Sequence, residues 1–202
     1  VIKAANSLPK GNYNVNILLP SIGVGGYCLT KDPLFLNALA QSLGSSFQTS
    51  LVSRSVNNES PLYAANRIHD ALSLRYSQLE PESIQIGVLG LAFKNNTGDC
   101  RFSPTIPAIQ SLIKFGYKVK VFDHYISEED YLLFKGSKRS SSIEELLKEC
   151  HALAFFAGHK EYKDISISIL EENLIPGALI FDGRVFFSQK QINSFKDSGF
   201  LY

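Results

Sequence analysis

The sequence predicts an α/β protein in which a helical region is followed by an open, doubly wound parallel sheet, that is, a Rossmann-like domain. Two observations carry this prediction. Residues 84–202 alternate between short β-rich runs and helical segments, which is typical of a parallel sheet with helices on its faces. Residues 1–80 instead carry apolar side chains at helical spacing, and a polar linker with a proline, residues 79–83, separates the two regions.

The first region is expected to contain two amphipathic helices. Residues 33–43 carry Leu36, Leu39, Ala40 and Leu43 at the spacing of one helical face. A second helix is expected to begin near Pro61, because proline is favoured at the first position of a helix. The apolar residues on its predicted buried face are Leu62, Ala65, Ile68, Ala71 and Leu72.

The second region is expected to contain four strands and three helices. The strands are residues 84–91, 118–123, 152–156 and 178–182. The helices are residues 103–115, ended by Gly116, residues 143–150, with an N-cap among 140–142, and residues 165–170. Such sheets bind ligands at the carboxyl ends of their strands, where this sequence places Phe93, Lys94, Asp123, His159 and Arg184. Asp123 follows Gly90 by 33 residues rather than the about 20 of a ribose-binding acid, so we interpret it as structural.

Composition narrows the class of protein. With 45% apolar and 19% charged residues the chain is an ordinary globular one, and its net charge of +1, without a basic run, argues against nucleic-acid or membrane-surface partners. No apolar stretch is long enough to span a bilayer. The three cysteines, Cys28, Cys100 and Cys150, have no zinc-binding spacing and fit a reducing, cytoplasmic compartment. His69, His124, His151 and His159 have no mutual metal-binding spacing either, so no metal site is expected.

The segment most suggestive of chemistry is residues 20–33, which read PSIGVGGYCLTKDP. Its glycines let backbone N–H groups approach a ligand closely. A helix is expected to begin just after Cys28, with Asp32 as N-cap and Pro33 at its first position, so that the helix dipole and Lys31 favour a thiolate. The alternative is that Cys28 is a small buried apolar residue and Asp32 only a cap.

This segment resembles the active-site loop of the UDP-glucose and UDP-N-acetylhexosamine 6-dehydrogenases, whose signature runs roughly P-G/S-x-G-x-G-G-x-C-x-x-K-D. Residues 90–104, GLAFKNNTGDCRFSP, are similar to a second motif of that family, G-x-x-F-K-x-x-T-x-D-x-R-x-S-P. Residues 182–184, DGR, are similar to a third. A looser likeness of residues 56–61, VNNESP, to the N-D-x-M-P element favours the N-acetylhexosamine branch. The resemblance covers the whole chain but only the C-terminal half of such an enzyme.

The resemblance implies an NAD-dependent, two-step oxidation of the sugar C6 alcohol to a carboxylate. Cys28 would be the catalytic nucleophile that forms a thiohemiacetal and then a thioester. Asp32 would orient or deprotonate the water that cleaves the thioester. The residues implied in binding the UDP-sugar are Gly25 and Gly26, through backbone N–H groups, and Phe93, Lys94 and Arg184, while Lys31 and Arg101 would contact NAD. Structural alternatives remain for the charged residues: a solvated Lys94, an ion-paired Lys31, and pairing of Arg184 with Asp182 or of Arg101 with Asp99.

The resemblance also implies a division of the chain. Residues 1–80 would form a helical central region that carries the cysteine loop and mediates a homodimer, and residues 84–202 the nucleotide-sugar-binding domain. The chain contains no G-x-G-x-x-G, so the NAD-binding domain is expected upstream of Val1 and the chain alone is not expected to turn over. A second hypothesis is a non-catalytic nucleotide-sugar-binding or dimerisation module. A thiol hydrolase pairing Cys28 with a histidine is disfavoured, because no sequence pattern brings a histidine near Cys28.

Overall fold

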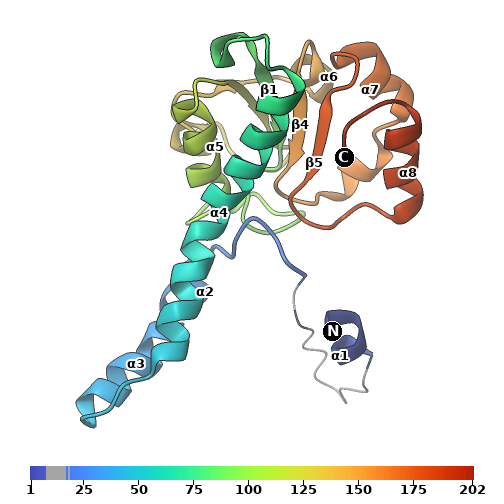
Figure 1. Ribbon diagram of the computed structural model, residues 1–202. Coiled ribbons are helices and arrows are strands. Elements are labelled where there is room, and N and C mark those ends of the chain that lie inside the picture. The colour runs from blue at the N-terminus through green and yellow to red at the C-terminus, as the bar shows by residue number, and fades with distance from the viewer. Residues whose placement is uncertain (8–16, 18) are drawn as a thin grey trace.

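The computed structural model of the protein describes residues 1–7, 17 and 19–202. Its centre is a parallel five-stranded sheet in the order β3-β2-β1-β4-β5 (Figure 1). The strands are β1 (Gln85–Leu89), β2 (Lys118–Phe122), β3 (Lys138–Arg139), β4 (Ala152–Phe155) and β5 (Leu179–Asp182). The four predicted strands are confirmed with slightly shorter ends. The edge strand β3 was not predicted, because two exposed basic residues carry no apolar alternation.

Helices cover both faces of the sheet, as predicted for a doubly wound fold (Figure 1). One face packs against α5 (Thr105–Lys114) and the C-terminal half of α4 (Gln48–Arg75). The other packs against α6 (Ile143–Leu147), α7 (Ile167–Asn173) and α8 (Gln189–Asp197). Neighbouring residues on a strand point to opposite faces, so Val88 belongs to the first core and Leu89 to the second.

Local capping signals placed three helices of this domain well, but α8, which begins with a capping box of Ser188 and Gln191, was not predicted. Ser142 accepts from the Glu145 N–H and begins α6 where predicted, although α6 ends three residues before the predicted Cys150. Ser166 caps α7 in the same way, and α7 therefore begins at Ile167, two residues after the predicted start at residue 165. Helix α5 ends just before Gly116, whose φ of +97° lies in the left-handed region that favours glycine.

Helix α4 differs from the prediction. It begins at Gln48 rather than near Pro61, and Pro61 lies inside it. An internal proline removes one backbone hydrogen bond and costs about 3 kcal/mol in an isolated helix. Here the following turns offset that cost, because Ala65, Ile68 and Leu72 are fully buried against the sheet. Of the predicted apolar face, Leu62 is wrong, since it is 48% exposed.

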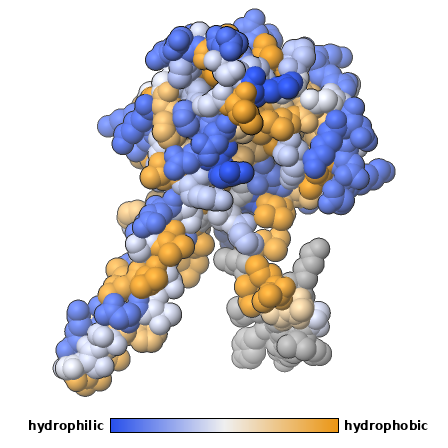
Figure 2. All heavy atoms as spheres, viewed as in Figure 1, coloured by the Kyte–Doolittle hydropathy of each residue, from blue (hydrophilic) through white to orange (hydrophobic). Residues whose placement is uncertain are grey.

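The N-terminal half of α4 forms an arm with α2 (Tyr27–Lys31) and α3 (Pro33–Ser42) that extends away from the sheet (Figure 1). The apolar face predicted for residues 33–43 is not buried within the described part of the chain, because Leu36, Leu39 and Leu43 are 56%, 58% and 75% exposed. Figure 2 shows hydrophobic residues along this arm. The amphipathic spacing of residues 33–43 therefore marks a face that residues 1–7, 17 and 19–202 leave uncovered.

The remaining described elements are short. They are α1 (Ile2–Asn6) and the 3₁₀ turns Pro81–Ser83, Asp130–Leu133 and Lys160–Asp164. The predicted linker, residues 79–83, falls between α4 and β1. The C-terminal half of α4 nevertheless lies in the same core as β1 and β2, so the arm and the sheet share one continuous helix.

Candidate substrate site

A cavity of about 430 Å³ lies at the carboxyl edge of the sheet, between the cysteine loop and two loops that follow strands. Four of the predicted binding residues, Gly25, Phe93, Lys94 and Arg184, line it together. The other lining residues are Leu19, Ser21, Gly23, Val24, Leu29 and Asn95. Sequence reasoning missed these six, although Asn95 directly follows Lys94 in the second motif and the others flank or belong to the cysteine loop.

The cysteine loop lies across the strand ends because its backbone is tied to both neighbouring loops. The Ile22 N–H donates to the Gly183 carbonyl at 3.1 Å, and the Gly26 N–H donates to the Arg101 carbonyl at 3.1 Å. The Gly26 N–H is therefore engaged within the protein and is not free to hold a ligand oxygen as predicted. We assign Gly26 a packing role instead, since an added Cβ would lie 2.9 Å from ring carbons of Phe93.

Gly25 is required by close packing. A Cβ at this position would collide with the Phe102 carbonyl oxygen and lie 2.8 Å from the Phe93 Cβ. Any larger side chain would separate the cysteine loop from the loop after β1. The glycine thus keeps the two walls of the cavity together.

Two cationic side chains, Lys94 and Arg184, line the cavity. Neither forms an ion pair with any of the described residues. The alternative partner of Arg184, Asp182, is used elsewhere: its carboxylate accepts from the backbone N–H groups of residues 184, 186 and 187 and from the Tyr202 hydroxyl. The guanidinium donates to Asn95 Oδ1 at 3.2 Å. Burial lowers the pKa of Arg184 from its ordinary value, against the attraction of Asp182. A half-buried cation without a carboxylate partner favours an anionic ligand.

Cys28 lies inside α2, not before a helix as predicted. Helix α2 begins at Tyr27 with Gly26 as N-cap, and Cys28 is exposed in its first turn. Asp32 does not cap α3 with its side chain; it has helical backbone angles, and its carboxylate pairs with Lys31 at 3.2 Å. Helix α2 continues almost directly into α3 because the Asp32 N–H donates to the Cys28 carbonyl. The alternative of a buried Cys28 is therefore wrong, while its predicted catalytic role remains a prediction.

The two predicted cofactor contacts lie outside the cavity: Lys31 is the last residue of α2, and Arg101 lies beside that helix. Arg101 forms the ion pair with Asp99 that was the structural alternative, and its guanidinium lies 5.0 Å from the centre of the Tyr27 ring. The Arg101 hydrogen bond lowers the pKa of Asp99 despite partial burial. Both cations remain more than half exposed, at 60% for Lys31 and 63% for Arg101.

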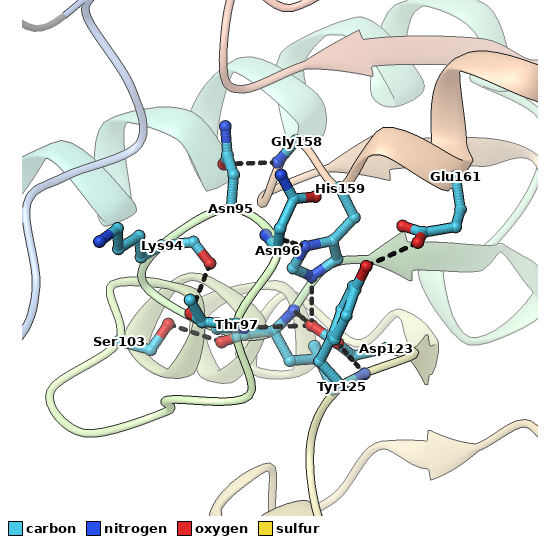
Figure 3. A network of polar contacts seen from close by, with 12 residues as sticks. Lys94, Asn95, Asn96, Thr97, Ser103, Asp123, Tyr125, Gly158, His159 and Glu161 are labelled. Carbon is cyan, nitrogen blue, oxygen red and sulfur yellow. Dashed lines mark hydrogen bonds and ion pairs between the residues drawn. The ribbon is translucent and has the colours of Figure 1, made fainter.

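The loop after β1 is held by a buried polar network that sequence reasoning did not find (Figure 3). Asp123 accepts from the Leu91 and Ala92 N–H groups at 2.6 and 3.2 Å, and from His159 Nε2 at 2.9 Å. Both side chains are fully buried. The structural interpretation of Asp123 is thereby confirmed. The sequence indicated that Asp123 and His159 each follow a strand, but it did not indicate that the two side chains pair.

Two negative observations concern the described residues alone. No cluster of three or more His, Cys, Asp or Glu side chains among them has a geometry that could hold a metal ion. None of their helices is both long and apolar enough to cross a membrane.

The parallel sheet with a cation-lined cavity at its carboxyl edge defines a Rossmann-like protein of the ligand-binding class. Residues 87–189 match the UDP-binding domain of the UDP-glucose/GDP-mannose dehydrogenase family, and residues 1–59 match its central domain. The chain belongs to this family.

Individual relatives agree with this assignment. The UDP-N-acetyl-D-mannosamine dehydrogenase of Pyrococcus horikoshii is 30% identical over 183 residues, covering 91% of this chain and 39% of the relative. A UDP-N-acetylmannosamine dehydrogenase structure from that organism superposes with a TM-score of 0.75 at 29% identity, covering 93% of this chain and 40% of the other. An NDP-N-acetyl-D-galactosaminuronic acid dehydrogenase from Methanosarcina mazei gives 0.78 at 25% identity, covering 99% and 42%. The chain thus spans about two fifths of these relatives.

Proposed function

We propose that this chain is the sugar-nucleotide-binding and nucleophile-bearing part of an NAD-dependent UDP-sugar 6-dehydrogenase. The observation that carries the proposal is the cavity lined by Lys94 and Arg184, neither of which has a carboxylate partner among the described residues. Leu29 lines the same cavity, and the residue before it on α2 is the exposed Cys28. A diphosphate supplies the missing negative charge, because arginine and lysine are the usual phosphate ligands. We favour a UDP-N-acetylhexosamine as substrate, in agreement with the names of the relatives.

In the proposed reaction Cys28 acts on the C6 aldehyde that the first oxidation produces. The thiolate sulfur forms a bond to the aldehyde carbon, and the carbonyl oxygen takes up a proton to give a thiohemiacetal. Loss of hydride from that carbon and of the proton from its hydroxyl group leaves a thioester. Water then attacks the thioester carbon, Asp32 receives the proton of the water, and the carbon–sulfur bond breaks to release the carboxylate and the thiol.

Both oxidations need a hydride acceptor, which NAD⁺ supplies when bound. The residues of this chain that we assign to it are Lys31 and Arg101. They fit the phosphates of a dinucleotide because both cations, Lys31 at the end of α2 and Arg101 next to that helix, remain exposed even while each is paired with a carboxylate. Arg101 also lies over the ring of Tyr27, and Tyr27 directly precedes Cys28 in the chain. This contact holds the guanidinium near the cysteine.

We further propose that the arm forms a homodimer interface. The exposed leucines of α3 are joined by Val52 and Val56 of α4, which are 59% and 61% exposed. A contiguous apolar surface of this kind is uncommon on a monomer and marks an interaction site. A second copy of the same chain supplies the complementary apolar face.

Calorimetry with this chain tests the binding part of the proposal. UDP is expected to bind and uridine to bind much more weakly, because only UDP carries the diphosphate for Lys94 and Arg184. The catalytic part is tested in the full gene product with UDP-N-acetylmannosamine, where two NADH are expected per sugar. Cys28→Ala should abolish the acid product, and Asp32→Asn should accumulate an acylated Cys28 visible by mass spectrometry. Wild-type turnover in both variants would contradict the assigned roles.

A second candidate is a nucleotide-sugar-binding module without turnover. It is favoured by one observation, that four of the predicted binding residues, Gly25, Phe93, Lys94 and Arg184, line one cavity. Binding of UDP-sugars by the full gene product without NADH formation would support the module over the enzyme.

A further inference from the structure

We propose that His159 is a positioning residue that holds the loop after β1, residues 91–99, so that Lys94 and Asn95 face the cavity. The proposal rests on the proposed function of that cavity as a UDP-sugar site. His159 is 0% exposed, follows β4, and takes no part in the chemistry described above.

The hydrogen bonds of His159 define a single tautomer. The Asn96 N–H donates to His159 Nδ1 at 2.7 Å, so this nitrogen carries no proton. The other ring nitrogen, Nε2, therefore carries the proton and donates to Asp123 Oδ2 at 2.9 Å. Figure 3 shows the imidazole between Asn96 and Asp123. His159 thus links the segments that follow three neighbouring strands, β1, β2 and β4.

The bond to Asn96 stabilises a backbone conformation that is otherwise unfavourable. Asn96 has φ of +57°, in the left-handed region that non-glycine residues seldom occupy. Its side chain gives a second tie, since Asn96 Oδ1 accepts from the Lys160 N–H at 2.9 Å. Without the acceptor on His159, the Asn96 N–H would lose its partner at this turn.

The turn at Asn96 controls the residues that line the cavity. Asn95 Oδ1 accepts from both the Gly158 N–H, at 2.9 Å, and the Arg184 guanidinium, at 3.2 Å. The Lys94 carbonyl accepts from the Thr97 hydroxyl at 3.0 Å, which closes the same turn. Displacement of Asn96 therefore moves Lys94, which belongs to the same turn. It also releases Arg184 from Asn95, the one side chain among the described residues to which its guanidinium is hydrogen-bonded.

Three substitutions separate the two bonds of His159. In His159→Asn the amide oxygen takes the place of Nδ1 and still accepts from Asn96, but the side chain is too short to reach Asp123. In His159→Gln the amide nitrogen takes the place of Nε2 and still donates to Asp123, but no acceptor faces Asn96. His159→Phe removes both bonds with little change in volume.

The test measures UDP affinity by calorimetry and amide hydrogen exchange of residues 93–98 in the whole chain. Positioning through Asn96 predicts about tenfold weaker binding and faster exchange for His159→Gln and His159→Phe, with His159→Asn close to wild type in both. It also predicts that the losses of His159→Phe and Lys94→Ala are less than additive when combined, because both act partly through Lys94. A purely structural role would instead lower the melting temperature and the fraction of competent molecules while leaving Kd unchanged.

Two results would overturn the proposal: unchanged Kd at full stoichiometry in His159→Phe, or equal losses in the Asn and Gln variants. If His159→Phe does not fold, the Asn and Gln pair alone decides. If the wild-type chain binds no UDP, the proposed function fails on its own, and the exchange rates of residues 93–98 then decide whether His159 holds this loop.

Discussion

Asn57 holds the backbone of Val24 with both ends of its side-chain amide. Its Oδ1 accepts from the Val24 N–H at 2.8 Å, and its Nδ2 donates to the Val24 carbonyl at 3.2 Å. Asn57 lies on α4 and Val24 in the cysteine loop, so this one side chain ties the loop to the arm. The position of Cys28 relative to the cavity therefore depends on Asn57, which does not itself line the cavity.

Asn57→Ala is expected to loosen the cysteine loop. Loss of two partly buried hydrogen bonds should lower the free energy of unfolding by about 1 to 3 kcal/mol, and amide exchange of residues 22–26 should accelerate. The matched control is Asn58→Ala, since the neighbouring Asn58 is exposed and its side-chain oxygen accepts from Arg54 on the same helix. Equal exchange rates in the two variants would show that Asn57 does not anchor the loop.

Lys94→Ala and Arg184→Ala are each expected to weaken UDP binding by about 1.5 to 3 kcal/mol, roughly 10- to 150-fold in Kd, because each removes a charged hydrogen-bond donor. Lys190→Ala serves as the control, since Lys190 is exposed on α8 and lies outside the cavity. Calorimetry on all three variants measures the difference. Unchanged affinity in both cavity variants would mean that the ligand does not lie over these strand ends.

Cys28 is expected to react with iodoacetamide well before Cys100 and Cys150. Cys28 is exposed, whereas the other two are 2% and 0% exposed. Burial raises the pKa of Cys100 to about 12 and that of Cys150 to about 11, so at pH ~8 fewer than about one in a thousand of either is the reactive thiolate. Mass-spectrometric labelling of the folded chain checks the order. Faster modification of a buried cysteine would contradict it.

Asp123 is expected to make stability depend on pH. Burial alone would raise the pKa of this carboxyl group, but hydrogen bonds from His159, Leu91 and Tyr125 outweigh it and hold the pKa below its ordinary value. A lowered folded-state pKa gives a stabilisation that is complete above the unfolded-state value of about 4 and is lost as the pH falls through the folded-state value.

Asp123→Asn should therefore reduce the free energy of unfolding most at neutral pH, by about 1 to 3 kcal/mol, and progressively less as the pH falls below about 4. Urea unfolding across this range measures the difference. Asp197→Asn is the control, because Asp197 is exposed at the end of α8. A pH-independent loss in Asp123→Asn would show that the carboxylate charge is not what stabilises the loop.

Local patterns predicted most of the elements whose formation depends on local signals, although the capping box of Ser188 and Gln191 at the start of α8 was missed. The β-rich runs became strands, and the serines before α6 and α7 became caps. The start of α4 could not be found in this way, because Pro61 carries a strong local signal for a helix start that packing of the following turns overrides. The pairing of Asp123 with His159 joins residues 36 apart, and only the strand order β2-β1-β4 brings them together.

The candidate site was predicted unevenly for the same reason. Lys94 and Arg184 were identified because each belongs to a motif that follows a strand, and the carboxyl ends of parallel strands meet at one edge. The engaged N–H of Gly26 depends on a contact between two loops, which no spacing along the chain specifies. The ion pair of Arg101 with Asp99 joins residues two positions apart and was the predicted structural alternative. The periodicity of residues 33–43 predicts that one face of α3 is apolar, but it does not show what covers that face.

That face leads to the last prediction. Leu36→Glu and Leu39→Glu are expected to convert a homodimer into monomers, because each places a charge in the centre of the proposed apolar interface. Leu74→Glu is the control, since Leu74 is an equally large apolar residue that is 85% exposed, but it lies on the C-terminal half of α4, outside the arm. Light scattering after gel filtration measures the mass, and UDP calorimetry shows whether the cavity is intact. A wild-type chain that is already monomeric at high concentration, or dimers that survive both substitutions, would contradict the proposed interface.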